Sequence, residues 1–143
     1  MQFNDTQLDA VQQFLQAGNL LAYPTEAVWG IGCDPFNETA VKQILAIKRR
    51  PIEKGMIVIT GVIAHIQPFL QPLSQQVVDS IAASWQSSDA QATTWLLPIP
   101  ATLQGKIPEW VTGGRDSLAI RVITHPMIAK LCNTIAHADN NNP

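Results

Sequence analysis

Five of the nine Lys and Arg residues in this chain lie between positions 42 and 54, although the whole chain carries a formal net charge of −2. Lys48, Arg49 and Arg50 are consecutive, and Lys54 follows soon after. Neighbouring cations repel one another unless an anion lies among them, and a polyphosphate or an RNA backbone would supply that anion. The alternative is a solvated helix end, where the helix dipole favours each cation by about 0.3–1 kcal/mol.

A hydroxyl group and a carboxylate follow the first short apolar segment that reads as a strand. Thr25 and Glu26 come directly after residues 20–23, and Pro24 closes that segment. Loops at strand ends are where α/β proteins place ligand-binding groups. The two side chains are therefore candidates for binding an amine or a hydroxylated ligand. A helix cap or a surface turn is the alternative.

A third candidate set lies on one later strand. Alternate residues of a strand point to the same side, so Ser117, Ala119 and Arg121 would share one face. An arginine on the inner part of a strand needs an anionic partner. A ligand phosphate or carboxylate would serve, and so would a structural ion pair with Asp116 or Glu26.

The elements that must position these residues alternate between helices and strands. Asp5 is expected to cap the first helix, and Asn37 or Thr39 is expected to begin the second. Gly30 and Gly32 remove side chains where another group must approach closely. The alternation predicts an α/β domain with a twisted mixed sheet flanked by helices. Periodicity and turn residues predict helices over 5–17, 37–50, 65–70, 74–85 and 126–134, and strands over 20–23, 28–33, 55–60, 93–98 and 117–123.

Length and composition suit one globular domain. The chain has 143 residues, 46% of them hydrophobic, which is enough for a core. We expect a single domain over residues 1–136 and a frayed tail over 137–143. The net charge excludes a generally basic nucleic-acid coat but not a local basic patch. No secretory signal is seen, and no apolar run reaches the roughly 20 residues of a membrane span, so we expect a cytoplasmic protein with no membrane partner.

The two cysteines, Cys33 and Cys132, show neither zinc-site spacing nor a disulfide framework. We expect both to be reduced, buried thiols, since free cysteine packs as a small hydrophobe. No metal-ligand spacing is recognised among the histidines either. The sequence also lacks the GxxxxGK[ST] and GxGxxG motifs. A nucleotide would therefore have to bind through other residues.

Two longer segments resemble one enzyme family. The segment AYPTEAVWGIGCDPFNETAVKQILAIKRRPIEKGMIVI closely resembles the start of the YrdC-like family, the bacterial threonylcarbamoyl-AMP synthases. The later segment DSLAIRVITHP resembles another stretch of the same family. The resemblance covers roughly residues 5–135. Its PTE turn, K-x-R-P motif and later Ser…Arg…His-Pro segment are specific as a set.

The resemblance implies a three-layer YrdC/RibB-like fold with a concave basic face. It implies an enzyme that forms threonylcarbamoyl-AMP and pyrophosphate from L-threonine, bicarbonate and ATP, with Mg²⁺ accompanying the ATP. The product would pass to partner proteins that modify an adenosine in tRNA. Concentrated Lys and Arg residues would then offset the repulsion among anionic substrates.

The resemblance also implies site residues, carried over position by position. Its K-x-R pair, which faces ATP and threonine, is the candidate catalytic pair and corresponds to Lys48 and Arg50. The threonine of the PTE turn lies near the amino-acid substrate, and residues of the later strand line the cavity. The candidate substrate-binding residues are Thr25, Ser117 and Arg121, and the candidate nucleotide-binding residues are Lys48, Arg50, Lys54 and Ser117.

The chain departs from the family pattern in two places. The segment SWQSSDAQATTWLLP stands where the family has a Pro-Gly-Pro-Thr type of segment. The chain ends in HADNNNP, without the family's Ser-Thr-Ser-Ala-Asn strand at the nucleotide site. We therefore expect a C-terminally truncated domain with marginal stability and weak or no activity. The alternatives are a non-catalytic module that binds tRNA or double-stranded RNA, and a degenerate paralogue.

Overall fold

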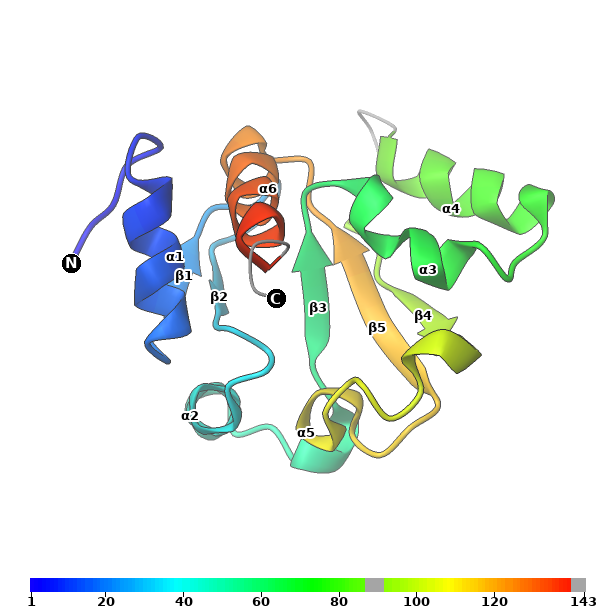
Figure 1. Ribbon diagram of the computed structural model, residues 1–143, viewed down its shortest axis with the longest axis horizontal. Coiled ribbons are helices and arrows are strands. Elements are labelled where there is room, and N and C mark those ends of the chain that lie inside the picture. Colours follow the sequence, from blue (N-terminus) through cyan, green and yellow to red (C-terminus); the bar gives the residue numbers. More distant parts are fainter. Residues whose placement is uncertain (87–91, 140–143) are drawn as a thin grey trace.

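Helices and strands alternate along the computed structural model, which describes residues 1–86 and 92–139 (Figure 1). The α-helices are α1 (Leu8–Gln16), α2 (Glu38–Ile47), α3 (Gln67–Leu70), α4 (Gln75–Gln86), α5 (Glu109–Thr112) and α6 (Pro126–Asp139). The strands are β1 (Leu21–Tyr23), β2 (Gly30–Gly32), β3 (Ile57–Thr60), β4 (Trp95–Pro98) and β5 (Ser117–Val122). Short 3₁₀ helices are η1 (Ile52–Lys54), η2 (Ile63–Ile66) and η3 (Ala101–Leu103).

The strands form two sheets. β1 and β2 make an antiparallel hairpin in which Tyr23 pairs with Gly30. In the other sheet β5 is central, with β3 parallel on one side and β4 antiparallel on the other. The mixed sheet flanked by helices that the sequence predicts is therefore confirmed.

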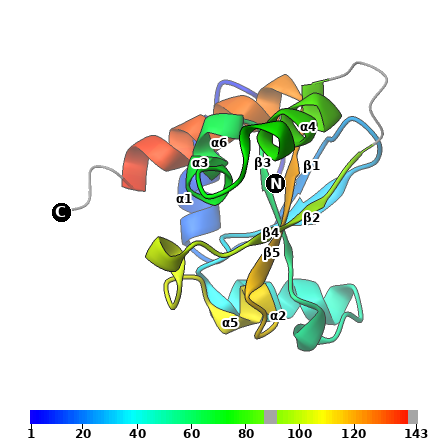
Figure 2. The same cartoon turned by 90° about the vertical axis from the view of Figure 1, so that its right-hand side faces the viewer.

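The helices lie at both ends of the strands. Figure 2 shows α3, α4 and α6 toward one end and α2 and α5 toward the other. β3 and β5 run in the same direction. Consequently α2 and α5 lie where these two strands begin, and α6 starts near where they end (Figure 1).

The main core covers one face of the three-stranded sheet. Burial alternates along β5, and Leu118, Ile120 and Val122 are the buried residues. They belong to the same hydrophobic cluster as Ile81 and Trp85 of α4. Because successive side chains of a strand point to opposite sides, the other three residues of β5 face away from this core.

A second apolar cluster joins the two ends of the chain. Val11 and Leu15 of α1 pack against Leu131 of α6. α6 also rests directly on the end of β3, since a Cβ atom at Gly61 would lie 2.4 Å from the Cα of Ala129. This close packing fixes α6 beside the strand ends where part of the site is formed.

The beginnings of the first two helices test the predicted caps. Asp5 does not cap α1, whose first turn has no side-chain cap. Its carboxylate instead forms an ion pair with Lys130 of α6, at an Oδ2–Nζ distance of 3.6 Å. Asn37 caps α2 as expected, since its Oδ1 accepts a hydrogen bond from the backbone N–H of Ala40 at 3.0 Å.

Other element boundaries shift by a few residues. β2 is shorter than the predicted 28–33, and β3 begins after Gly55, whose φ of 63° is left-handed. α6 continues past residue 136 to Asp139, and residues 140–143 of the expected tail lie outside the described residues, as do residues 87–91. Among the described residues, no helix combines the length and apolar character needed to cross a membrane.

Candidate functional site

The turn that carries Thr25 and Glu26 joins the two strands of the hairpin. The Thr25 hydroxyl group donates a hydrogen bond to the carbonyl oxygen of Val28 at 2.6 Å, from Oγ1 to O. It also accepts one from the backbone N–H of Ala27 at 3.1 Å. The hydroxyl therefore fixes the shape of this turn and does not cap a helix.

Glu26 reaches from this turn to β5. The Arg121 Nη2 atom donates a hydrogen bond to Glu26 Oε1 at 2.5 Å, between residues 95 positions apart in the sequence. Their side chains are 27% and 22% exposed, for Glu26 and Arg121 respectively, so the ion pair is partly shielded from solvent. Of the two protein partners that the sequence left open for Arg121, the structure shows Glu26.

At least one hydrogen-bond donor of Arg121 has no partner. A guanidinium group has five N–H donors, and the Nη2 atom is bonded to Glu26. The Nε atom is buried and has no hydrogen-bond partner. Because an unpaired buried donor costs roughly 1–3 kcal/mol, this arginine is a strong candidate for contact with a ligand.

Tyr23 lies close to this ion pair. Its ring packs on the two hairpin glycines: a Cβ atom at Gly30 or Gly32 would lie 2.6 or 2.8 Å from ring carbons. The close approach that these glycines predict is therefore made by Tyr23. Burial raises the pKa of Tyr23, and the nearby positive charge of Arg121 opposes that rise.

The Glu26 carboxylate is favoured in its ionised form. Partial burial alone would raise the pKa of Glu26, but the hydrogen bond and charge of Arg121 outweigh it and place the pKa below the ordinary 4.5. His125 acts in the same direction. It stands just before α6, where its Nδ1 accepts a hydrogen bond from the backbone N–H of Met127 at 3.3 Å.

The face of β5 that points away from the core connects the two ends of the candidate site. Ser117, Ala119 and Arg121 are all partly exposed on it, as their spacing predicts. Ile57 of β3 and Leu96 of β4 pair with Ala119 from either side, and they are 48% and 64% exposed. We call this surface the open face of the sheet.

The cationic segment forms a turn between α2 and β3. Arg50 Nε donates a hydrogen bond to the carbonyl oxygen of Gly55 at 2.8 Å, and its Nη2 donates to that of Lys54 at 3.1 Å. Lys48, Arg49 and Lys54 are exposed. Arg50 thus stabilises the turn that presents the other cations, a structural contribution that its sequence position does not reveal.

The expected site residues fall into two groups along β5. The cationic turn precedes β3 and Ser117 begins β5, so the parallel pairing places both at the same end of the sheet. Thr25 and Arg121 belong to the other group. Arg121 lies four residue steps along the strand from Ser117, which is about 13 Å at roughly 3.3 Å per residue. Within the described part of the chain, no ion pair joins the two groups.

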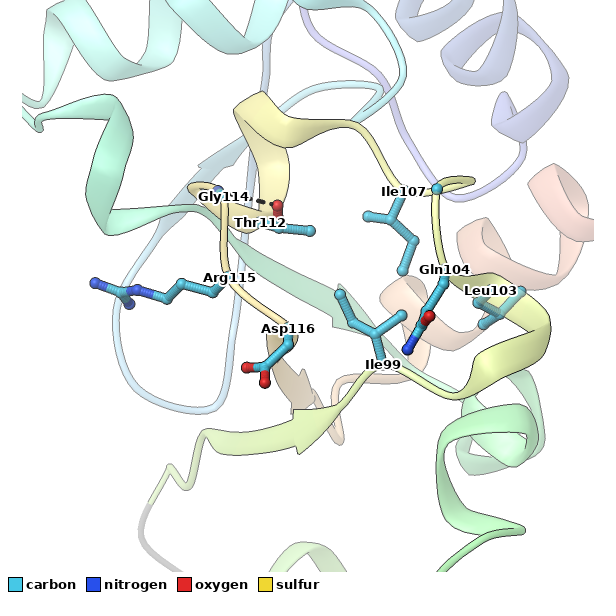
Figure 3. A pocket seen from close by; sticks show the side chains of 9 residues that line it. Ile99, Leu103, Gln104, Ile107, Thr112, Gly114, Arg115 and Asp116 are labelled. Carbon is cyan, nitrogen blue, oxygen red and sulfur yellow. Dashed lines mark hydrogen bonds between the residues drawn. The ribbon is translucent and has the colours of Figure 1, made fainter.

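A surface cavity of about 380 Å³ lies beside the start of β5 (Figure 3). Ile99 and Ile107 point toward its interior, whereas the side chain of Arg115 points away from it. Another cavity, of about 240 Å³, lies between α2 and α5 beside Trp110. The expected site residues line neither cavity, so the candidate site is the open face and its two ends.

Cys33 and Cys132 are free thiols, and both are partly buried where the sequence predicts buried thiols. Burial raises the pKa of Cys33 to about 11, and the charge of Asp34 acts in the same direction. Burial also raises the pKa of Cys132, although hydrogen bonds from Gly61 and Thr60 oppose this. In the described residues, no three His, Cys, Asp or Glu side chains form a possible metal site.

Comparison with known proteins now identifies the family. Residues 13–138 match the Sua5/YciO/YrdC family, which carries the description "telomere recombination". The chain belongs to the Sua5/YciO/YrdC family. The resemblance that the PTE turn and the K-x-R-P motif indicate is therefore confirmed.

Relatives with closely similar sequences share one name. The chain is 50% identical over 132 residues to a protein of Psychrobacter cryohalolentis named threonylcarbamoyl-AMP synthase, and the match covers 89% of this chain and 62% of that protein. A protein of Hydrogenovibrio crunogenus with the same name is 46% identical over 128 residues, covering 90% of this chain and 66% of that protein. The chain thus spans about two thirds or less of the length of these relatives.

Solved structures confirm the fold. Sua5 from P. abyssi, in a crystal structure complexed with L-threonine, superposes with a TM-score of 0.73 at 24% identity and covers 95% of this chain and 38% of that one. E. coli YciO gives a TM-score of 0.70 at 13% identity, over 94% of this chain and 62% of that one. The α/β fold expected from the YrdC-like resemblance is therefore correct.

Neither Tyr23 nor His125 was among the expected site residues. Tyr23 carries a usable signal, because it ends a strand just before the PTE turn and pairs with one of the two glycines. His125 belongs to the His-Pro end of the segment DSLAIRVITHP, but that motif does not show that it lies near Glu26. It approaches Glu26 because α6 follows β5, which is a property of the fold.

Proposed function

We propose that this chain acts as a threonylcarbamoyl-AMP synthase, which forms threonylcarbamoyl-AMP and pyrophosphate from L-threonine, bicarbonate and ATP. The observation that carries the proposal is the shared name of relatives that are 46–50% identical over about nine tenths of the chain. The geometry supports it, because cationic groups stand at both ends of the open face. Such an arrangement suits two anionic ligands that meet along one surface.

The amino acid is assigned to the end of the open face near Arg121. The buried Nε–H of this guanidinium group has no partner and can donate to a carboxylate. Charge-assisted hydrogen bonds of this kind are among the strongest in proteins. Thr25 lies in the same turn as Glu26, and a hydroxyl oxygen has two lone pairs. One accepts from Ala27, so another remains for an ammonium or hydroxyl group of the ligand.

ATP is assigned to the other end of the open face. Lys48 and Lys54 are exposed and would neutralise phosphate charge, while Arg50 keeps the turn in shape and would contribute charge of its own. Ser117 would offer a hydroxyl group at the start of β5. Lys48 and Arg50 are the residues we propose for the catalytic step, in which charge builds up at the transferring phosphoryl group.

The proposed reaction joins three substrates in a balanced sequence. The threonine amine adds to the carbon of bicarbonate, with loss of water, and gives a carbamate. A carbamate oxygen then bonds to the α-phosphorus of ATP while the bond to pyrophosphate breaks, which is an adenylyl transfer. Mg²⁺ would enter with ATP, since it is usually bound largely through substrate phosphates. We place this reaction in the cytoplasm, with partner proteins that pass the product to tRNA.

Direct RNA binding is the second candidate function, because exposed cations on a turn can contact phosphates. Few observations favour it. The net charge is −2, and the exposed cations of the turn are Lys48, Arg49 and Lys54. Non-specific binding of RNA depends on the number of phosphates neutralised. Three cations on one turn give a weak and strongly salt-dependent interaction.

A pyrophosphate-release assay tests the proposed function. The full chain should release pyrophosphate only when L-threonine, bicarbonate, ATP and Mg²⁺ are all present, and omission of any one should abolish release. Mass spectrometry should detect threonylcarbamoyl-AMP. Substitution of Arg121 by Ala should abolish threonine-dependent release, whereas substitution of the surface residue Glu38 by Gln should not. Binding of tRNA without any pyrophosphate release would favour the RNA-binding alternative.

A further inference from the structure

The ion pair between Glu26 and Arg121 uses only one of two Arg121 donors that could together bind a carboxylate. On one edge of a guanidinium group, the Nε–H and one Nη–H point in parallel and match the two oxygens of a carboxylate. Glu26 engages this edge through one contact, from Arg121 Nη2 to Oε1. The Nε atom is buried and without a partner. An arginine with a purely structural role would be expected to use both donors.

The residues around the pair limit what Glu26 can do. The turn that carries it is fixed internally by the Thr25 hydroxyl, so the backbone of Glu26 is already positioned. Tyr23 is packed on the hairpin glycines and lies near the guanidinium. The charge of His125 also lowers the pKa of Glu26 and so favours its negative form. A change of partner at Arg121 therefore requires only side-chain rotation of Glu26, with the hairpin in place.

We propose that Glu26 occupies, in the unliganded chain, the place of the ligand's carboxylate, and that it turns to the ligand's ammonium group when the amino acid binds. This inference rests on the proposed function, since it concerns the amino-acid end of that site. An ion pair of Arg121 and Glu26 that opens around a ligand presents one positive and one negative group. That is the complement of a zwitterion.

The exchange makes Glu26 a specificity-determining residue. A zwitterionic amino acid replaces the internal ion pair with two new ones, so no charge is left without a partner. A carboxylate that lacks the amine would displace Glu26 from Arg121 and leave the glutamate unpaired in a partly shielded position, which is unfavourable. The chain should therefore prefer amino acids over simple hydroxy acids of the same shape.

Isothermal titration calorimetry with two probes tests this preference. The probes are L-threonine and β-hydroxybutyrate, which keeps the carboxylate and hydroxyl groups but lacks the amine. Glu26→Gln should weaken threonine binding and leave β-hydroxybutyrate binding unchanged or tighter, so that the ratio of the two affinities falls at least tenfold. Glu26→Asp should restore part of the preference. Glu38→Gln, which removes a surface carboxylate paired with Lys42, is the matched control and should leave the ratio unchanged.

NMR of the unsubstituted chain provides a test that does not depend on the folding of a variant. The Arg121 Nε–H signal, assigned by its loss in Arg121→Lys, should shift strongly when threonine is added, because this donor gains a partner. An unmoved signal, or equal loss of both affinities in Glu26→Gln, would overturn the exchange while leaving the proposed function standing. Failure of the unsubstituted chain to bind threonine at all would overturn both.

Discussion

Two arginines show how one side-chain type serves different purposes in this chain. Arg50 donates hydrogen bonds to two backbone carbonyl oxygens of its own turn. Arg121 pairs instead with Glu26 across a long sequence separation and keeps a buried donor unpaired. The first arrangement is local and stabilises a turn, whereas the second leaves capacity for a ligand. Counting cations in the sequence does not separate these cases.

We expect Arg50→Ala to weaken ATP binding at least tenfold, since a hydrogen bond to a charged group contributes about 1.5–3 kcal/mol. Loss of the bonds to Lys54 and Gly55 should also lower the unfolding temperature. Arg49→Ala is the matched control, because Arg49 is an exposed neighbour on the same turn. Titration calorimetry and thermal unfolding of both variants give the two readouts. Equal losses of affinity would mean that the turn provides only a diffuse positive field.

The Glu26 carboxylate should make the stability of the chain depend on pH in a defined range. Its pKa in the folded chain is lower than its ordinary value of 4.5. Its contribution is therefore present above about pH 4.5 and is lost as the pH falls through the lower folded-state value. Urea unfolding at a series of pH values should show a shallower acid dependence for Glu26→Gln than for the unsubstituted chain. Identical acid dependence would contradict the assigned pKa shift.

At the scale of elements, local sequence signals succeeded where the competing interactions were also local. Asn37 caps α2 as predicted, because the bond to Ala40 lies within the same turn. The alternation along β5 also followed from spacing alone. Asp5 did not cap α1, and it pairs instead with Lys130 at the other end of the chain. That partner is brought near by the packing of α1 on α6, which no local pattern encodes.

The contact between β3 and α6 should be intolerant of any added side chain. A Cβ atom at Gly61 would lie 2.4 Å from backbone atoms of Ala129. We expect Gly61→Ala to lower the free energy of unfolding by about 2 kcal/mol or more, because overpacking forces backbone shifts. Gly105→Ala, with no atom within 4 Å of its added Cβ but a φ of +73°, should cost less. Urea unfolding compares the two, and a smaller loss for Gly61→Ala would contradict the packing.

For the whole molecule, the sequence predicted the architecture, and it proposed site residues without showing how they would be brought together. The family motifs are continuous segments, and the resemblance proposed Thr25, Arg50 and Arg121 from them. The sequence left the partner of Arg121 open between a ligand, Asp116 and Glu26. That choice depends on where the hairpin lies relative to β5, which is set by long-range packing. The positions of Tyr23 and His125 beside this ion pair could not be predicted for the same reason.

The three-stranded sheet has one covered face and one open face. Substitution of two neighbouring leucines of β4 can test this arrangement. Leu97 is 2% exposed in the core, whereas Leu96 is 64% exposed on the open face. Leu97→Ala should cost about 2–5 kcal/mol of unfolding free energy, as buried leucines do. Leu96→Ala should change it by about 0.5 kcal/mol or less, as for most surface substitutions. Because both changes remove the same atoms from adjacent positions of one strand, strand propensity cancels in the comparison. Similar losses in urea unfolding would mean that the open face is covered in solution, and the site assigned to it would then be inaccessible.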